Sequence, residues 1–168
     1  TGITILAIAV GTNYHYYLTY KIGMTHTYLF SLYAILLYYT IEWHQGPTKR
    51  KALWLGFLVA FIGVCRPSDI LCILIPLLYG VFSKESLLRK INQIREYKSH
   101  FVYALLAGFI AGLPQIIYWK WTINEWISIG YFDNGNPLDL LNPHLLEGLF
   151  SYQKGWLLYT PIMLLAII

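Results

Sequence analysis

Charged side chains are scarce in this chain, at 12% of its 168 residues, against about 25% in a typical soluble domain. Hydrophobic residues make up 57% and aromatic residues 17%. The apolar residues fall in long runs, which is typical of membrane-spanning helices. We therefore predict an all-α, polytopic transmembrane protein with extracytoplasmic loops. The net charge of +4 does not indicate a nucleic-acid partner, because it separates by membrane side once the topology is drawn.

Residues suited to metal or nucleotide chemistry are also few. The two cysteines, Cys65 and Cys72, lie in apolar runs without a metal-ligand or disulfide pattern, so we interpret them as packing residues. The five histidines have no short metal-ligand spacing. No Walker loop, dinucleotide fingerprint or nucleophile elbow occurs. We therefore expect no metal site, no cofactor and no nucleotide-driven chemistry within these residues.

A signal peptide and an initiating methionine are both missing from the sequence. The chain begins in one apolar run and ends in another. We interpret residues 1–168 as a single transmembrane domain without a soluble domain. We expect it to be a fragment of a longer protein, truncated through a helix at both ends.

One arginine interrupts the apolar sequence, in Arg66-Pro67-Ser68-Asp69 between residues 52–65 and 70–82. A single helix over 52–82 would be about 46 Å long, well beyond the ~30 Å hydrocarbon core. It would also place basic segments on both sides of the membrane, although such segments favour the cytoplasm. We therefore predict a short broken-helix hairpin. Pro67 ends its first helix and Ser68 or Asp69 caps its second.

The position of Arg66 needs a partner, because a charge at membrane depth normally faces a polar cavity or another charge. Each arm of the hairpin is about 20 Å long, too short to cross fully, so we expect the turn at head-group level. A guanidinium there is suited to a phosphate, because its fork donates bidentate hydrogen bonds. The alternative is an arginine that extends to the interface or pairs with Asp69.

The segments around the hairpin alternate between apolar and polar. We expect full spans at 27–43 and 101–119, the second kinked at Pro114 and closely packed through Gly108 and Gly112. Truncated spans are expected at 2–11 and 157–168. The basic segments 44–51 and 83–100 are predicted to be cytoplasmic. Together with Glu42, at the inner end of the preceding span, they have a charge balance of +5. We interpret 83–100 as an amphipathic helix on the inner leaflet, or alternatively as a solvated linker helix.

The polar residues with functional potential gather on the predicted outer side. Segment 12–26 is dense in tyrosine, which favours the membrane–water interface. Segment 120–155 has a turn signal at 134–137. Its carboxylates could act as bases or bind hydroxyls near sugars, or be solvated loop charges; they are Glu125, Asp133, Asp139 and Glu147. Lys154 could contact a phosphate or anchor the last helix.

Four segments together carry a family likeness. In chain order they are Gly11-Thr12-Asn13, residues 23–28 (GMTHTY), residues 66–71 (RPSDIL) and residues 149–161 (LFSYQKGWLLYTP). They resemble segments of bacterial multi-pass glycosyltransferases of the GT-C superfamily, which are related to dolichyl-phosphate-mannose protein mannosyltransferases and lipid A aminoarabinose transferases. The last segment, with its Phe-Ser-Tyr-x-Lys-Gly-Trp run, is the most distinctive.

The resemblance implies many membrane helices with an active site on the extracytoplasmic face of the bacterial inner membrane. It implies a sugar donor on a polyprenyl phosphate and a glycan, lipid or protein acceptor, with a carboxylate as base. In such enzymes that carboxylate lies in the first extracytoplasmic loop, which we expect to precede this sequence, so the catalytic residue stays unknown. Arg66 and Lys154 are then expected to bind the lipid phosphate. The expected cavity-lining residues are Asn13, His26, Asp69 and Tyr152.

Two other functions are compatible with this pattern. A transporter or flippase for a lipid or an anionic solute would show repeats and paired broken helices near the midplane. The sequence has one broken hairpin and no repeat. An O-antigen polymerase or ligase would also have outer loops and arginines.

Overall fold

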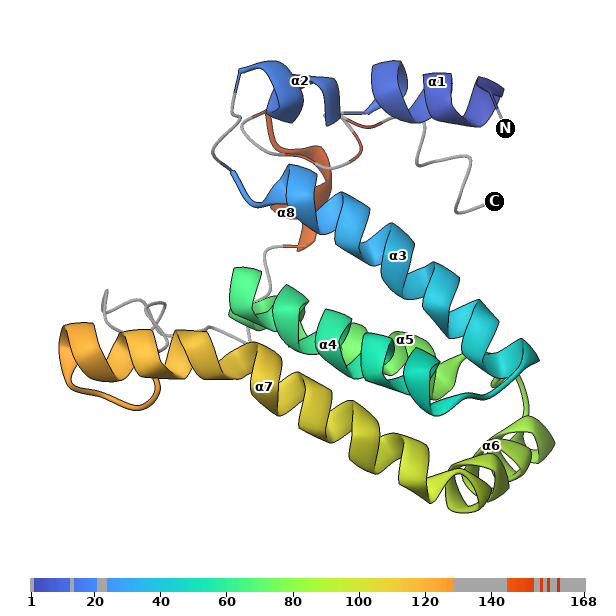
Figure 1. The fold of residues 1–168 in the computed structure, drawn as a ribbon. Helices are drawn as coiled ribbons and strands as arrows, with labels where there is room; N and C mark the ends of the chain where they lie inside the picture. Colours follow the sequence, from blue (N-terminus) through green and yellow to red (C-terminus); the bar gives the residue numbers. More distant parts are fainter. Residues whose placement is uncertain are drawn as a thin grey trace. The chain divides into compact units, whose positions relative to one another are not determined.

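The computed structural model describes residues 2–12, 14–20, 24–128, 145–152, 155, 157 and 160. The regular elements in these ranges are all helical, as predicted (Figure 1). The chain divides into two compact units, residues 28–130 and residues 1–27 with 131–168. The unit of residues 28–130 contains α3 (His26–Gln45), α4 (Lys49–Cys65), the 3-10 helix η1 (Pro67–Ile73), α5 (Leu74–Leu78), α6 (Lys84–Glu96) and α7 (Lys98–Ile123). The first two residues of α3 belong to the other unit.

The other unit contains α1 (Gly2–Gly11), α2 (Tyr14–Thr19) and α8 (Leu145–Phe150). α1 has the bounds that its apolar run predicts. Thr12 separates it from α2: its hydroxyl donates to the Ile8 carbonyl at 2.6 Å and accepts from the Tyr14 amide at 3.2 Å. Helix α8 lies inside segment 120–155, which we expected to be an outer loop. The short polar stretches of sequence on either side of α8 did not indicate a helix. The turn predicted at 134–137 and the span predicted at 157–168 lie outside the described residues, apart from Leu157 and Thr160.

Helix α3 buries one face against α4. Its buried residues recur at alternating intervals of four and three, which is the spacing of one helical face; they are Leu29, Leu36, Thr40 and Trp43, with Tyr33 half-buried between them. Leu36 and, from α4, Ile62 are fully buried. The Thr40 hydroxyl donates to the Leu36 carbonyl at 2.7 Å, so this polar group is satisfied within its own helix.

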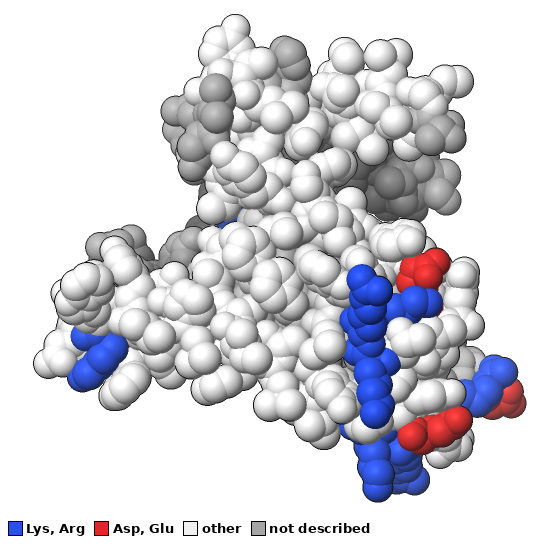
Figure 2. All heavy atoms as spheres, in the orientation of Figure 1, with Lys and Arg blue, Asp and Glu red and all other residues white. Residues whose placement is uncertain are grey.

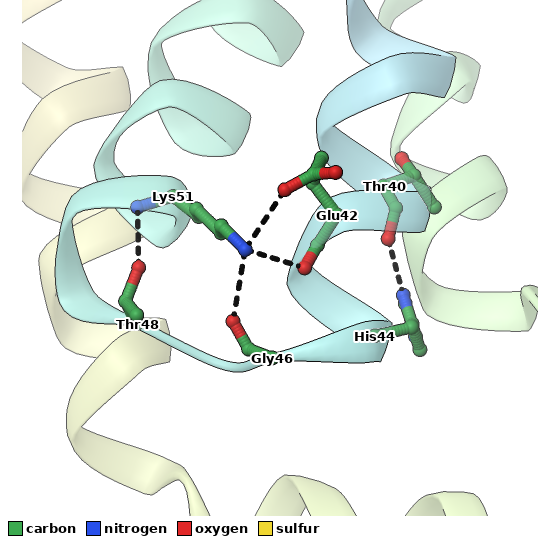
Figure 3. Close-up of polar contacts among 6 residues, drawn as sticks. All are labelled: Thr40, Glu42, His44, Gly46, Thr48 and Lys51. Carbon is green, nitrogen blue, oxygen red and sulfur yellow. Dashed lines mark hydrogen bonds and ion pairs between the residues drawn. The ribbon is translucent and has the colours of Figure 1, made fainter.

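A tight turn at Gly46-Pro47 joins α3 to α4 (Figure 3). The Lys51 ammonium donates to the carbonyls of Glu42 at 2.8 Å and Gly46 at 3.2 Å, and lies 3.0 Å from the Glu42 carboxylate. It thereby donates to one carbonyl in the last turn of α3, that of Glu42, and to one just after the helix, that of Gly46. Thr48 caps α4 by accepting from the Lys51 amide at 3.3 Å. These contacts hold the two helices antiparallel.

Helices α4 and α7 lie side by side, and their backbones approach each other closely (Figure 1). A Cβ added at Gly56 would be 1.9 Å from the backbone oxygen of Ala104, and one added at Gly108 would be 3.2 Å from the Gly56 oxygen. The close packing predicted at Gly108 is therefore confirmed. The same prediction for Gly112 is wrong, because a Cβ there meets no described atom within 4 Å. Small residues allow this contact only where the helices cross.

Helix α7 is longer than the predicted span 101–119 at both ends. Tyr97 ends α6 and also starts α7, so the amphipathic helix expected to reach residue 100 ends at Glu96. At the far end, α7 continues to Ile123, where Asn124 adopts a left-handed conformation (φ 59°). Pro114 lies inside α7, which changes direction along its length in Figure 1. A missing amide donor at Pro114 accounts for this bend.

Much of the apolar surface of α7 is exposed, and of its residues only His100 is buried. Soluble monomers rarely leave such an extended apolar surface uncovered. Among the described helices, α7 alone is both long enough and apolar enough to cross a membrane. Helix α3 has 20 residues but is more polar, and α4 has 17.

Candidate anion site at the interrupted helix

The break between α4 and η1 forms as predicted at Arg66. Its backbone is extended (φ −153°, ψ 110°), because Pro67 disfavours a helical conformation at the preceding residue. The predicted cap is wrong: the second arm begins as a 3-10 helix, and no side chain accepts a hydrogen bond at its start. Ser68 instead donates to the carboxylate of Asp69 at 3.1 Å. The second arm is also shorter than predicted, because α5 ends at Leu78.

Arg66 and Asp69 lie together, as the alternative interpretation of the arginine proposed. The Arg66 Nε atom is 3.6 Å from Asp69 Oδ1. This is an ion pair without hydrogen-bond geometry. The Arg66 side chain is 40% exposed and that of Asp69 is 18% exposed. Ion pairs that reach solvent contribute only about 0–1 kcal/mol. Since Arg66 is the more exposed partner, an incoming anion can compete for it.

Two hydroxyl donors and one cation surround the Asp69 carboxylate. Oδ1 receives the Ser68 hydroxyl and faces Arg66, and Oδ2 accepts from the Tyr33 hydroxyl at 3.3 Å. The carboxylate is therefore occupied as an acceptor and positions the guanidinium. Within the described part of the chain, the two terminal nitrogens of Arg66 have no partner. They remain able to donate to a bound anion.

The sequence interpretation missed Tyr33. It comes from α3, 36 residues before Asp69, and its ring lies against the buried core. The alternating spacing of four and three on α3 could have placed it on the face turned toward α4. The hydrogen bond to Asp69 could not have been found this way, because it depends on the tertiary arrangement of α3 and η1.

The other predicted site residues lie elsewhere or outside the described residues. His26 contacts the Tyr17 ring, with centroids 4.8 Å apart, and Tyr152 is 84% exposed. Both belong to the unit formed by residues 1–27 and 131–168. Asn13, Lys154, Asp133 and Asp139 lie outside the described residues, and so does the side chain of Glu147. Of the six predicted site residues, the described structure brings together Arg66 and Asp69.

Two of the histidines have structural roles. His100 is buried, and its Nδ1 accepts from the Trp43 indole at 3.2 Å. His44 Nδ1 lies 2.7 Å from the Thr40 carbonyl (Figure 3). Among the described residues, no group of three or more histidine, cysteine or acidic side chains could hold a metal ion.

Comparison with known proteins gives no relative: no family model matches the chain, and neither a curated protein nor a solved structure does. The likeness to multi-pass glycosyltransferases therefore rests on the sequence motifs alone.

Proposed function

We propose that the protein is a multi-pass membrane glycosyltransferase. It moves a sugar from a polyprenyl-phosphate carrier to an acceptor on the extracytoplasmic face of the cell membrane. Arg66, oriented by Asp69 and Tyr33, holds the carrier phosphate. The residue that acts as base is not assigned.

The membrane setting is supported by the charge distribution of residues 28–128. The last turn of α3, the residues that follow it up to Lys51, and the α6 region with Lys98 hold eight lysines and arginines against three glutamates, Glu42, Glu85 and Glu96. Figure 2 shows these cations gathered at the end where α6 lies in Figure 1. The other end of the described unit has Arg66, Asp69, Lys120 and Glu125, with no net charge. An excess of cations at one end is typical of the cytoplasmic side.

Helix α6 supports the same setting. It buries Lys90, at 7% exposed, and leaves Leu88 62% exposed, together with Leu87 and Ile91. A solvated linker helix would turn its leucines toward the protein. A helix lying on the inner leaflet turns them toward lipid.

The observation that carries the proposal is Arg66 at a helix break opposite the basic end. In this topology the break lies at the outer face, where a lipid-linked donor presents its phosphate. A phosphate leaving the sugar gains negative charge, and a guanidinium aimed at it stabilises that charge. The neighbouring ion pair fixes the direction of the guanidinium without occupying its terminal nitrogens.

Transfer activity and donor binding test this proposal. Membranes with the complete protein would be supplied with a radiolabelled sugar on polyprenyl phosphate, and binding of polyprenyl phosphate measured in detergent. We expect Arg66→Ala to lower both, with binding reduced about tenfold or more, because a hydrogen bond to a charged group contributes about 1.5–3 kcal/mol. Arg50→Ala, which removes an exposed arginine at the basic end, serves as the control. Equal binding by both variants would overturn the phosphate role of Arg66.

A transporter for a lipid or an anionic solute is the second candidate, favoured by the interrupted helix α4–η1–α5. Interrupted helices form ion and substrate sites in many transporters. Uptake of the carrier lipid across proteoliposomes, without sugar transfer, would favour this candidate.

A further inference from the structure

An apolar cavity lies between α4, α7 and the arm formed by η1 and α5. Its volume is about 420 Å³, within the range of about 300–1,000 Å³ that is common for ligand pockets. Its walls are almost entirely apolar and include Leu55, Val59, Ile73 and Phe101. Lys90 and His100 are the charged or titratable residues that line it. Both lie at the basic end of the unit.

A second, polar cavity of about 540 Å³ adjoins the first at Lys90, which lines both. It lies between the end of α3, the turn after α5 and α6, and its lining includes His44, Tyr79, Arg89 and Glu96. The apolar cavity and the polar cavity therefore both border the Lys90 side chain. This arrangement is the shape complement of a molecule with a hydrocarbon chain and a polar head.

The polar cavity favours an anion. Lys90 donates to His44 Nε2 and to the Tyr79 carbonyl, the latter at 3.2 Å. An ammonium has three donors, so one remains. His44 Nδ1 faces the Thr40 carbonyl, so its Nε2 is the acceptor and the ring is neutral. Arg89 is exposed and has no partner among the described residues. Glu96 is the one acidic residue in the lining, and it contacts Tyr97.

We propose that these two cavities bind one anionic phospholipid of the inner leaflet. An acyl chain occupies the cavity between α4, α7 and the η1–α5 arm, and the phosphate lies against Lys90 and Arg89. The exposed leucines of α6 place this helix in the leaflet from which such a lipid enters. The inference rests on the membrane setting of the proposed function, but not on sugar transfer.

The test measures lipid that stays bound to the complete protein in detergent, where the bilayer surface potential is absent. The protein is purified with equal amounts of phosphatidylglycerol and phosphatidylcholine, and the bound lipid is measured by mass spectrometry. We expect about one phosphatidylglycerol per chain, retained in preference to phosphatidylcholine. Equal retention of the two lipids, or retention of neither, would overturn the proposal.

Arg89 and Arg95 provide a matched pair, because both are exposed arginines of α6 and only Arg89 lines the polar cavity. We expect Arg89→Ala to weaken phosphatidylglycerol binding about fivefold and Arg95→Ala to change it less than twofold. Ala60→Leu narrows the apolar cavity without changing charge, and we expect it to lower retention as well. If Arg89→Ala and Arg95→Ala behave alike, the site is wrong.

The two proposals fail separately. Arg89→Ala leaves Arg66 untouched, so polyprenyl-phosphate binding at the outer site should be unchanged. If the unaltered protein transfers sugar but does not prefer phosphatidylglycerol, the inner-leaflet site alone is refuted. Normal lipid selectivity without any sugar transfer would refute the proposed enzyme alone.

Discussion

The close approach of α4 and α7 predicts that Gly56 tolerates no side chain. The Cβ of Gly56→Ala would be 1.9 Å from the Ala104 backbone oxygen, whereas real contacts of this kind are longer than 3.0 Å. The obstacle is backbone, so it cannot rotate away. The two helices would have to separate by about 1 Å along their contact, which loses packing on both sides.

The magnitude follows from two opposing effects. Overpacking costs about 1–3 kcal/mol, and replacing glycine by alanine inside a helix returns up to about 1 kcal/mol. We expect a net loss of about 1–2 kcal/mol for Gly56→Ala. For a chain of this size that lowers the unfolding temperature by about 2–8 °C.

Gly112→Ala is the matched control, because it makes the same exchange inside α7 where a Cβ meets nothing described. Its stability should be unchanged or slightly higher. Gly108→Ala, with its contact at 3.2 Å, should lie between the two. Thermal unfolding of the three variants in detergent, followed by tryptophan fluorescence, gives the order. Gly56→Ala as stable as Gly112→Ala would refute the helix contact.

Two further predictions concern the basic end. Burial first, and then the nearby Lys90 ammonium, lower the pKa of His44 below its ordinary value, although its hydrogen bond to Thr40 opposes this. The unfolded chain therefore takes up the proton first, and stability should fall as the pH drops below about 6.5. His44→Gln should flatten this decline in unfolding temperature between pH 7.5 and 5.5; an unchanged decline would mean that His44 is not its source. Gly80 has φ +79°, so Gly80→Ala should lower the free energy of unfolding by about 1–2 kcal/mol. Gly46→Ala is the control, because Gly46 has no positive φ, and it should cause no such loss. Equal unfolding temperatures for the two variants would contradict this.

The sequence predicted the ends of α3 and α4, because a strong local signal lies at each of them. Gly46-Pro47 ends α3 and Arg66-Pro67 ends α4, and the basic segments separate the apolar runs. The ends of α7 were wrong, because Tyr97 and Asn124 act as boundaries through their backbone conformation, which their residue types indicate only weakly. The 3-10 form of η1 was likewise not indicated by composition.

The candidate site was predicted in part. The pairing of Arg66 with Asp69 could be proposed because the two are three residues apart, within one turn. Tyr33 and Asp69, by contrast, are 36 positions apart, and Lys90 and His44 are 46 positions apart. Such contacts depend on how the helices pack and have no local signal. Helix α6 also buries Lys90 and exposes Leu87 and Leu88, whereas its helical pattern alone suggests that the leucines are buried.

The account depends most on which side of the membrane each end of the described unit faces. Single cysteines at exposed Ser68 and Gln45, introduced in a chain with Cys65→Ala and Cys72→Ala, can be labelled with a membrane-impermeant maleimide on intact cells. The account predicts labelling of Ser68→Cys from outside, and labelling of Gln45→Cys only after the membrane is opened. Two results would contradict it, because in either case Arg66 would face the cytoplasm. One is labelling of Gln45→Cys from outside. The other is a Ser68→Cys that is protected on intact cells and labelled once the membrane is opened.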